Sequence, residues 1–190
     1  MHKEYITDIM TRRPVLQTQR LILRFLKPED WKDLYSYARL PEVSQYLLWD
    51  PHHTASYTRR YLRDLQKLYE LGEYFEWGIE EKESGTLIGT CGFTDFDFYN
   101  MVGELGYSFS PSVWGKGYAT EAAMEVVHFG FEVLHLKEIR AIYAPENHAS
   151  KRVLEHLHMT YMGELPHMTI KGIEHKVGLY TIYKDQMQSL

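Results

Sequence analysis

The second half of the chain contains a glycine-rich segment that could bind phosphate groups, Trp114-Gly115-Lys116-Gly117-Tyr118-Ala119-Thr120-Glu121-Ala122. It lies between an expected strand and the clearest amphipathic helix of the sequence. Glycines let the backbone turn tightly, and a helix N-terminus offers unpaired N–H groups and a partial positive charge. Such a junction favours phosphate oxygens, and Lys116 adds a mobile cation. The spacing matches neither the dinucleotide fingerprint nor the P-loop, so a glycine turn without a ligand is an equally good interpretation.

A second polar segment, Asn147-His148-Ala149-Ser150, also joins an expected strand to an expected helix. Asn147 is well placed as the N-cap of that helix, and capping is its ordinary role. Ser150 falls in the first turn, where its hydroxyl could donate a proton or a hydrogen bond. A first-turn serine is more often simply solvated, so the segment predicts either a capped helix start or a proton donor.

A carboxylate inside an expected strand is the third candidate for chemistry. Glu104 lies between Gly103 and Leu105 in the strand expected over 102–110. It could act as a general base if it faces a cleft. A strand glutamate more often faces solvent, and the sequence alone does not choose between the two.

Composition indicates an ordinary globular protein. The chain has 190 residues, a formal charge of 21 − 26 = −5, 44% hydrophobic and 25% charged residues. These values are typical of soluble domains and exclude a disordered protein. No apolar run approaches the roughly 18 residues that a membrane-spanning helix needs, and the opening MHKEYITDIM does not resemble a secretory signal.

Cysteine count and charge narrow the class of protein further. The single cysteine, Cys91, cannot form an internal disulfide, and no Cys/His spacing indicates a zinc site. We therefore expect a cytoplasmic protein without a metal. The acidic balance argues against a general nucleic-acid binder, which would carry a basic field.

Hydrophobic periodicity predicts a mixed α/β fold in one domain, 1–190. Residues 1–14 are expected to be a loose extension. Helices are expected around 31–38, 41–46, 54–71, 119–134 and 147–157. Strands are expected at 21–26, 74–80, 87–98, 102–110, 138–144, 161–165 and 177–183. The predicted architecture is a central, mostly antiparallel mixed sheet of about seven strands, flanked by helices.

In this order, these segments resemble the GNAT superfamily of N-acetyltransferases, and within it the ribosomal-protein N-terminal (alanine) acetyltransferase branch. The resemblance rests on Gly106-Tyr107-Ser108-Phe109-Ser110, on the glycine-rich segment and on the Asn147–Ser150 segment. The opening strand at 16–24 is similar as well, and the resemblance extends from about Leu16 to Tyr183. Three motifs at the right separations are more specific than any one of them.

The resemblance implies that acetyl-CoA is the co-substrate and that no metal takes part. It implies a splayed strand pair, in which the strand before the glycine-rich segment pairs with the pantetheine arm, while the segment binds the pyrophosphate. The implied cofactor-binding residues are Phe109, Ser110, Trp114, Gly115, Lys116, Gly117, Tyr118, Ala119, Thr120 and Asn147. Ser150 is implied to protonate the departing thiolate or to donate a hydrogen bond to it.

The implied reaction is direct transfer of an acetyl group to a primary amine. A base or a water chain must take the amine proton, and an acid must assist the thiolate. Cys91 is therefore expected to be a buried strand residue and not a nucleophile. A carboxylate that serves as base in some relatives has no counterpart near His167, which leaves Glu104, His167 and ordered water as candidates. His167 has an ordinary pKa near about 6.5, but it follows Pro166 in an expected turn, so Glu104 is slightly preferred.

The acceptor is expected to be a protein N-terminal amine, such as that of a ribosomal protein. A small amine (polyamine, amino acid or drug) and a CoA-binding paralogue without turnover are the alternatives. A nucleotide-binding protein unrelated to CoA is disfavoured, because its phosphate fingerprints are missing. One departure concerns the helix after Ser150, which ends in His156-Leu157-His158-Met159 without the glycine that relatives carry. Whether the chain forms a homodimer is left open.

Overall fold

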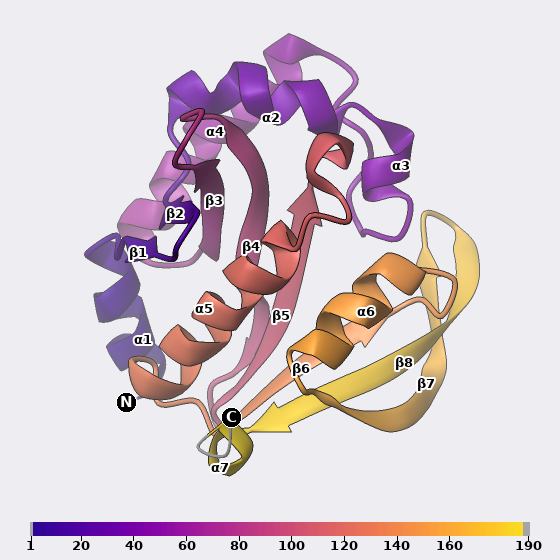
Figure 1. The fold of residues 1–190 in the computed structure, drawn as a ribbon. Helices are drawn as coiled ribbons and strands as arrows, with labels where there is room; N and C mark the ends of the chain where they lie inside the picture. The colour runs from indigo at the N-terminus through magenta and orange to yellow at the C-terminus, as the bar shows by residue number, and fades with distance from the viewer. Residues whose placement is uncertain (1, 188–190) are drawn as a thin grey trace.

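The structure is a computed structural model that describes residues 2–187. Its centre is one eight-stranded sheet with the order β1-β2-β3-β4-β5-β6-β8-β7 (Figure 1). The strands are β1 Leu16–Gln17, β2 Leu21–Arg24, β3 Phe75–Glu81, β4 Leu87–Asp97, β5 Val102–Phe109, β6 Glu138–Tyr143, β7 Thr160–Ile170 and β8 Ile173–Tyr183. All neighbouring pairs are antiparallel except β5 and β6. The predicted mixed, mostly antiparallel sheet is confirmed, with eight strands where about seven were expected.

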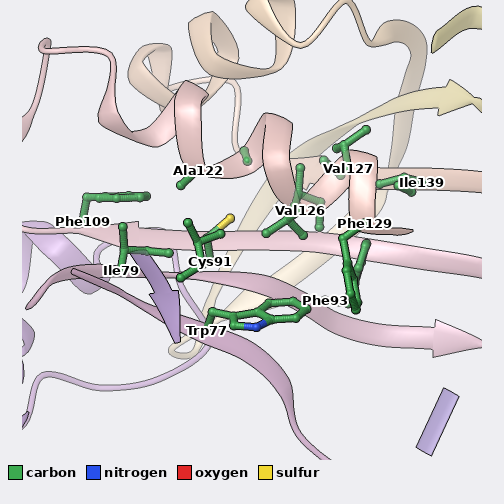
Figure 2. Close-up of a cluster of buried hydrophobic side chains, with 14 of the residues drawn as sticks. Trp77, Ile79, Cys91, Phe93, Phe109, Ala122, Val126, Val127, Phe129 and Ile139 are labelled. Atoms are coloured by element: carbon green, nitrogen blue, oxygen red, sulfur yellow. The ribbon is translucent and has the colours of Figure 1, made fainter. Parts of the chain in front are cut away.

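Helices cover both faces of the sheet. The α-helices are α1 His2–Thr11, α2 Trp31–Ala38, α3 Pro41–Ser44, α4 Ala55–Leu71, α5 Tyr118–Glu132, α6 His148–His156 and α7 Lys184–Met187. In Figure 1, α5 crosses in front of the sheet while α4 lies behind it. Figure 2 shows the core beneath α5, where Trp77 and Phe93 of the sheet meet Val126 and Phe129 of the helix. Across residues 2–187, no helix combines the length and apolar character that a membrane crossing requires.

The parallel pair separates soon after it forms, which creates a gap in the middle of the sheet. β5 pairs with β6 only over Val102–Glu104 and Glu138–Arg140. Beyond that point β5 stays paired with β4 as far as Phe109, and β6 stays paired with β8 as far as Tyr143. The rest of β5 therefore has one free edge facing β6, visible as the divergence of the two strands in Figure 1. The predicted splayed pair is confirmed.

The first residues of the chain are not the loose extension that was expected. Residues 2–11 form α1, and its side chains Ile6 and Met10 are fully buried. The helix packs against α4. A mostly polar sequence concealed this packing because only one narrow stripe of α1 is apolar, and such a stripe is enough when a partner helix covers it.

The two closing strands are longer than predicted. β7 continues through Pro166 and His167 to Ile170, and β8 begins at Ile173, so Pro166 lies inside a strand and not in a turn. The ladder is irregular between Leu165 and Met168. Proline lacks an N–H and is tolerated in a sheet at such a bulge. The turn comes later, at Lys171 and Gly172, both with positive φ.

Helix α6 ends without its usual glycine, and His158 takes the left-handed conformation in its place. Its φ is 57°, and the Met159 N–H donates to the Leu154 carbonyl at 3.1 Å, which closes the helix. A side chain in this conformation costs about 1 kcal/mol relative to glycine. The absent glycine therefore weakens the helix end but does not prevent it.

His158→Gly is therefore expected to stabilise the protein. A gain of about 1 kcal/mol corresponds to a Tm increase of about 2–4 °C in a chain of this size, measurable by thermal unfolding. His156→Gly is the matched control, because His156 is the last residue of α6 and has an ordinary helical conformation. That control should lower Tm. A lower Tm for His158→Gly would contradict this account.

Candidate active site

The glycine-rich segment forms an exposed loop between β5 and α5. Gly115 and Gly117 have φ values of 74° and 80°, and a Cβ on Gly115 would meet no described atom within 4 Å. Gly117 is the N-cap of α5, and no side chain caps the helix. Because the first N–H groups of a helix have no intrahelical partner, they are available to a ligand there. The loop therefore has the open backbone that a phosphate group requires.

Arg20, which directly precedes β2, holds the glycine-rich loop and the first turn of α5 together. Its guanidinium donates to the Lys116 carbonyl at 3.0 Å and to Glu121 at 2.6 Å, and it lies 4.1 Å from the centre of the Tyr118 ring. Burial would raise the pKa of Glu121, but hydrogen bonds from Thr18 and Arg20 outweigh it, so the pKa is lowered. Glu121 therefore stays ionised and holds the first turn of α5. The sequence did not indicate Arg20, because an arginine next to a strand gives no local signal of a partner about 100 residues away.

A cavity of about 230 Å³ lies where β5 and β6 separate. Its walls come from the loop after α3, the middle strands, the start of α6 and the β7–β8 hairpin. Three of the predicted site residues line the cavity: Glu104, Asn147 and Ser150. Four further polar residues, which the sequence did not single out, line it as well: Glu76, Thr90, Tyr107 and Ser108. The gap in the sheet is thus the place where the chemistry-bearing side chains meet.

Ser150 is held at the cavity wall by two neighbours. The Asn147 side chain caps α6, accepting a hydrogen bond from the Ser150 N–H at 3.1 Å. The Ser150 hydroxyl lies 2.8 Å from the Tyr107 hydroxyl. Burial raises the pKa of Tyr107, although its hydrogen bond with Ser150 lowers it in part, so this phenol stays protonated at neutral pH. The pair can donate a hydrogen bond or a proton into the cavity.

Glu104 lies at the point where β5 leaves β6. Its backbone is the last on β5 to pair with β6, opposite Arg140, and its carboxylate accepts a hydrogen bond from Thr94 at 3.4 Å. Burial and the charge of Asp95 raise the pKa of Glu104, and the Thr94 hydrogen bond lowers it in part. A half-buried carboxylate in this place can attract a cation.

Glu76 is a second carboxylate in the cavity, and sequence analysis missed it. It lies on β3 between Phe75 and Trp77, and alternation predicts that it faces away from the α5 core into solvent. On the opposite face α2 packs against β4, and Tyr69 of α4 donates a hydrogen bond to the Glu76 carbonyl, so Glu76 is desolvated there. The local sequence shows only that Glu76 shares its strand face with Tyr74 and Gly78. Its burial can be recognised only when the helices that cover this face are known.

Not all predicted residues meet in one place. The Phe109 side chain points into the core beneath α5 (Figure 2), and its carbonyl accepts a hydrogen bond from the Trp114 indole at 2.8 Å. Ser110 lies at the loop, 2.9 Å from Ser112 through their hydroxyls. His167 is exposed on β7 and does not line the cavity. Cys91 is fully buried in β4, as expected, and burial raises the pKa of its thiol.

An extended phosphate-bearing ligand fits these features. The loop offers backbone N–H groups at one end, the free edge of β5 offers unpaired peptide groups along the gap, and the cavity lies at the other end. Coenzyme A has a pyrophosphate, an amide-containing arm and a terminal thiol in that order. Among residues 2–187, no group of three or more His, Cys, Asp or Glu side chains is placed to hold a metal ion.

Comparison with known proteins agrees with this geometry. Residues 20–160 match the acetyltransferase (GNAT) domain family. The chain is 37% identical over 142 residues to the N-acetyltransferase p20 of Bacillus licheniformis, covering 75% of this chain and 80% of that protein. It is 30% identical over 172 residues to the N-acetyltransferase YoaA of Bacillus subtilis, covering 90% and 97% of the two chains.

Solved structures show the same fold. A GNAT-family acetyltransferase from Bacillus anthracis superposes with a TM-score of 0.79 at 25% identity, over 90% of this chain and 99% of that one. The ribosomal-protein-S5-alanine acetyltransferase of Vibrio fischeri gives 0.73 at 22% identity, with 90% and 97% covered. The spermidine N-acetyltransferase of Vibrio cholerae, solved with CoA and spermine, gives 0.76 at 19% identity, with 90% and 99% covered. The chain therefore belongs to the GNAT family and is an acetyl-CoA-dependent N-acetyltransferase.

Proposed function

We propose that the protein transfers the acetyl group of acetyl-CoA to a primary amine held in the cavity, and that this amine is a protein N-terminus. The observation that carries the proposal is the cavity itself, which joins the free edge of β5 to a proton-donating pair and to two carboxylates. Leu48, which lines the cavity, is 75% exposed, so the cavity opens to a surface that a peptide could cross. The fold likeness to a ribosomal-protein-S5-alanine acetyltransferase supports this acceptor class.

The residues divide the reaction between them. Gly115, Gly117 and the first turn of α5 bind the pyrophosphate, with Lys116 as an additional cation. Glu104 attracts the ammonium group of the acceptor to the point where the strands separate. Once the amine has lost a proton, its nitrogen attacks the thioester carbonyl, and the Ser150–Tyr107 pair donates a proton to the thiolate as the C–S bond breaks.

A small polyamine is the second candidate acceptor. Two carboxylates in one cavity suit an acceptor with more than one positive charge, and the fold is shared with a spermidine N-acetyltransferase. The deciding experiment measures thiol release from acetyl-CoA with peptides of differing N-terminal residues and with spermidine, spermine and simple monoamines. Turnover of peptides well above that of polyamines supports the N-terminal assignment, and the reverse order replaces it with the polyamine.

Glu104→Gln tests the role of the carboxylate at the strand separation. Removing the charge while keeping the shape should raise KM for the amine about 10-fold, since a hydrogen bond to a charged group is worth about 1.5 kcal/mol. The measurement is the initial rate at varied amine and saturating acetyl-CoA. His167→Asn is the control and should keep wild-type kinetics, because His167 lies outside the cavity. An unchanged KM in Glu104→Gln would remove Glu104 from the acceptor site.

A further inference from the structure

Glu76 lines the cavity and belongs to a row of paired residues that runs across three neighbouring strands. Glu76 pairs with Gly92 on β4, and Gly92 pairs in turn with Gly106 on β5. A Cβ on Gly106 would lie 2.4 Å from the Thr94 methyl carbon, and one on Gly92 would lie 2.4 Å from the Glu76 Cα. Both positions are therefore restricted to glycine. Gly92 and Gly106 thus add no side chain of their own beside Glu76 in this row, and the Thr94 methyl group packs over Gly106.

Hydroxyl groups connect Glu76 to the strand that borders the gap. The Thr90 and Tyr74 hydroxyl groups are the neighbours that lower the pKa of Glu76. Thr90 lies 3.1 Å from Ser108 through their hydroxyls, and Ser108 lies on the free-edged part of β5 and lines the cavity. On the other side, Tyr74 lies 3.0 Å from Tyr61 of α4. These contacts fix the orientation of the carboxylate relative to the reacting strand.

Among residues 2–187, no positively charged group contributes to the pKa shift of Glu76. Burial raises its pKa to about 7, and the two hydroxyl groups lower it in part. The ionisable groups of α2, α4, β3 and β4 whose pKa values respond to the Glu76 charge are all neutral at pH 7: Tyr37, Tyr61, Tyr69, Tyr74 and Cys91. A carboxylate in this setting exchanges a proton near neutral pH, which suits a general base.

We propose that Glu76 is the general base that takes the proton of the acceptor amine, while Glu104 binds the ammonium group without accepting its proton. This assignment rests on the proposed function and names a residue for one of its steps. An N–H bond of the ammonium breaks as an O–H bond forms on Glu76, directly or through Ser108 and Thr90. The freed nitrogen attacks the thioester, and its second proton replaces the one that Ser150 gives to the thiolate. Glu76 then returns its proton to water, which balances the cycle.

Glu104 is the less suitable base for two structural reasons. It lies at the strand separation, where its carboxylate is placed to bind the ammonium group, and it shares its surroundings with the charged Asp95. Both carboxylates keep some exposed surface, but desolvation dominates at Glu76 and raises its pKa to about 7. The two carboxylates of the cavity thus have different roles: Glu104 attracts the ammonium group, and Glu76 removes its proton.

The pH dependence of kcat at saturating acetyl-CoA and amine tests the proposal. The wild type should show an acidic limb with a midpoint at or below about 7, because Glu76 must be ionised and a bound ammonium favours the ionised form. Glu76→Gln should lose that limb and about 100-fold or more of kcat, with unchanged affinity for coenzyme A by calorimetry. Glu104→Gln should keep the limb. Loss of the limb in Glu104→Gln and its retention in Glu76→Gln would overturn the proposal in favour of Glu104.

Coenzyme A binding and turnover of the wild type separate failure of this proposal from failure of the proposed function. If the wild type neither binds coenzyme A nor releases thiol with any amine, the proposed function fails first. If the wild type turns over and both glutamine variants keep its profile, only the assignment of Glu76 is wrong.

Thr90→Val should move the acidic limb of kcat to higher pH, because a hydrogen bond that favours the ionised form of Glu76 is lost, and Thr90→Ser should restore it. An unmoved limb in Thr90→Val would count against Glu76 as the titrating group.

Thermal unfolding of Glu76→Gln tests whether the variant folds and whether the Glu76 carboxylate is buried without a compensating charge. The pKa of Glu76 is higher in the folded than in the unfolded chain, so the folded protein binds more protons between about pH 4.5 and 7. The wild type therefore loses stability as pH rises through this interval, and a glutamine at this position does not. The Tm of Glu76→Gln relative to the wild type should be higher at pH 8 than at pH 5. The opposite trend would contradict the buried, uncompensated carboxylate on which the proposal stands.

Discussion

Gly117→Asp is expected to reduce the affinity for coenzyme A by about 100-fold or more. Gly117 ends the loop at φ 80° and caps α5. An aspartate there adds a negative charge where the pyrophosphate must approach the backbone. It also replaces attraction by repulsion, which is worth several kcal/mol at the short distances and reduced dielectric of such a site. Calorimetric titration with coenzyme A measures the loss.

The variant should still fold, which makes the result interpretable. Aspartate tolerates the left-handed region better than most residues and is a good N-cap. The matched control is Gly85→Asp, because Gly85 has φ 66° in the open β3–β4 turn, where a Cβ would meet no described atom within 4 Å. This control carries the same charge and the same backbone cost but should bind coenzyme A normally. Normal binding by Gly117→Asp would show that the loop does not hold the pyrophosphate.

Ser150→Ala is expected to lower kcat about 10- to 100-fold while the affinity for coenzyme A barely changes. The Ser150 hydroxyl is the member of the Ser150–Tyr107 pair at the start of α6. Loss of a proton or hydrogen-bond donor to a leaving group affects mainly the transition state, so kcat falls more than binding. Single-turnover rates and calorimetry on the same preparation separate the two quantities.

Tyr107→Phe distinguishes a chemical role of Ser150 from a structural one. It leaves the serine hydroxyl and the Asn147 cap in place but removes the Tyr107 hydroxyl group, which lies 2.8 Å from the Ser150 Oγ. If the tyrosine orients the serine, Tyr107→Phe should lose kcat by a smaller factor than Ser150→Ala, and the double variant should lose no more than Ser150→Ala alone. Equal losses of binding and rate in Ser150→Ala would instead mark the serine as structural.

The central elements could be predicted because their signals are local. The helices expected over 54–71 and 119–134 agree within two residues with α4 and α5. Predictions were wrong where a distant partner decides the outcome. The loose extension expected at 1–14 is instead largely the helix α1, because α4 covers its apolar stripe at Ile6 and Met10. That stripe could not be recognised without knowing where α4 lies.

The candidate site divides along the same line. The glycine-rich loop before α5 and the Asn147–Ser150 turn could be located from the sequence, because each is a short motif at a strand–helix junction. Arg20, Glu76 and Tyr107 could not, since each acquires its role from contacts across strands far apart in sequence. His167 was a candidate because some relatives carry a base near its position, and the turn expected at Pro166 counted against it; the structure instead places both residues in a bulged strand. Proline at a bulge and proline in a turn are identical in the sequence.

Initial-rate kinetics of thiol release test the central claim most directly, which is that the amine attacks acetyl-CoA while both are bound. Acetyl-CoA and the best acceptor of the panel are varied together, and the intact mass of the protein is measured after incubation with acetyl-CoA alone. Direct transfer predicts intersecting double-reciprocal lines and an unmodified protein. Parallel lines together with a protein that carries one acetyl group would show a covalent intermediate and would contradict the account.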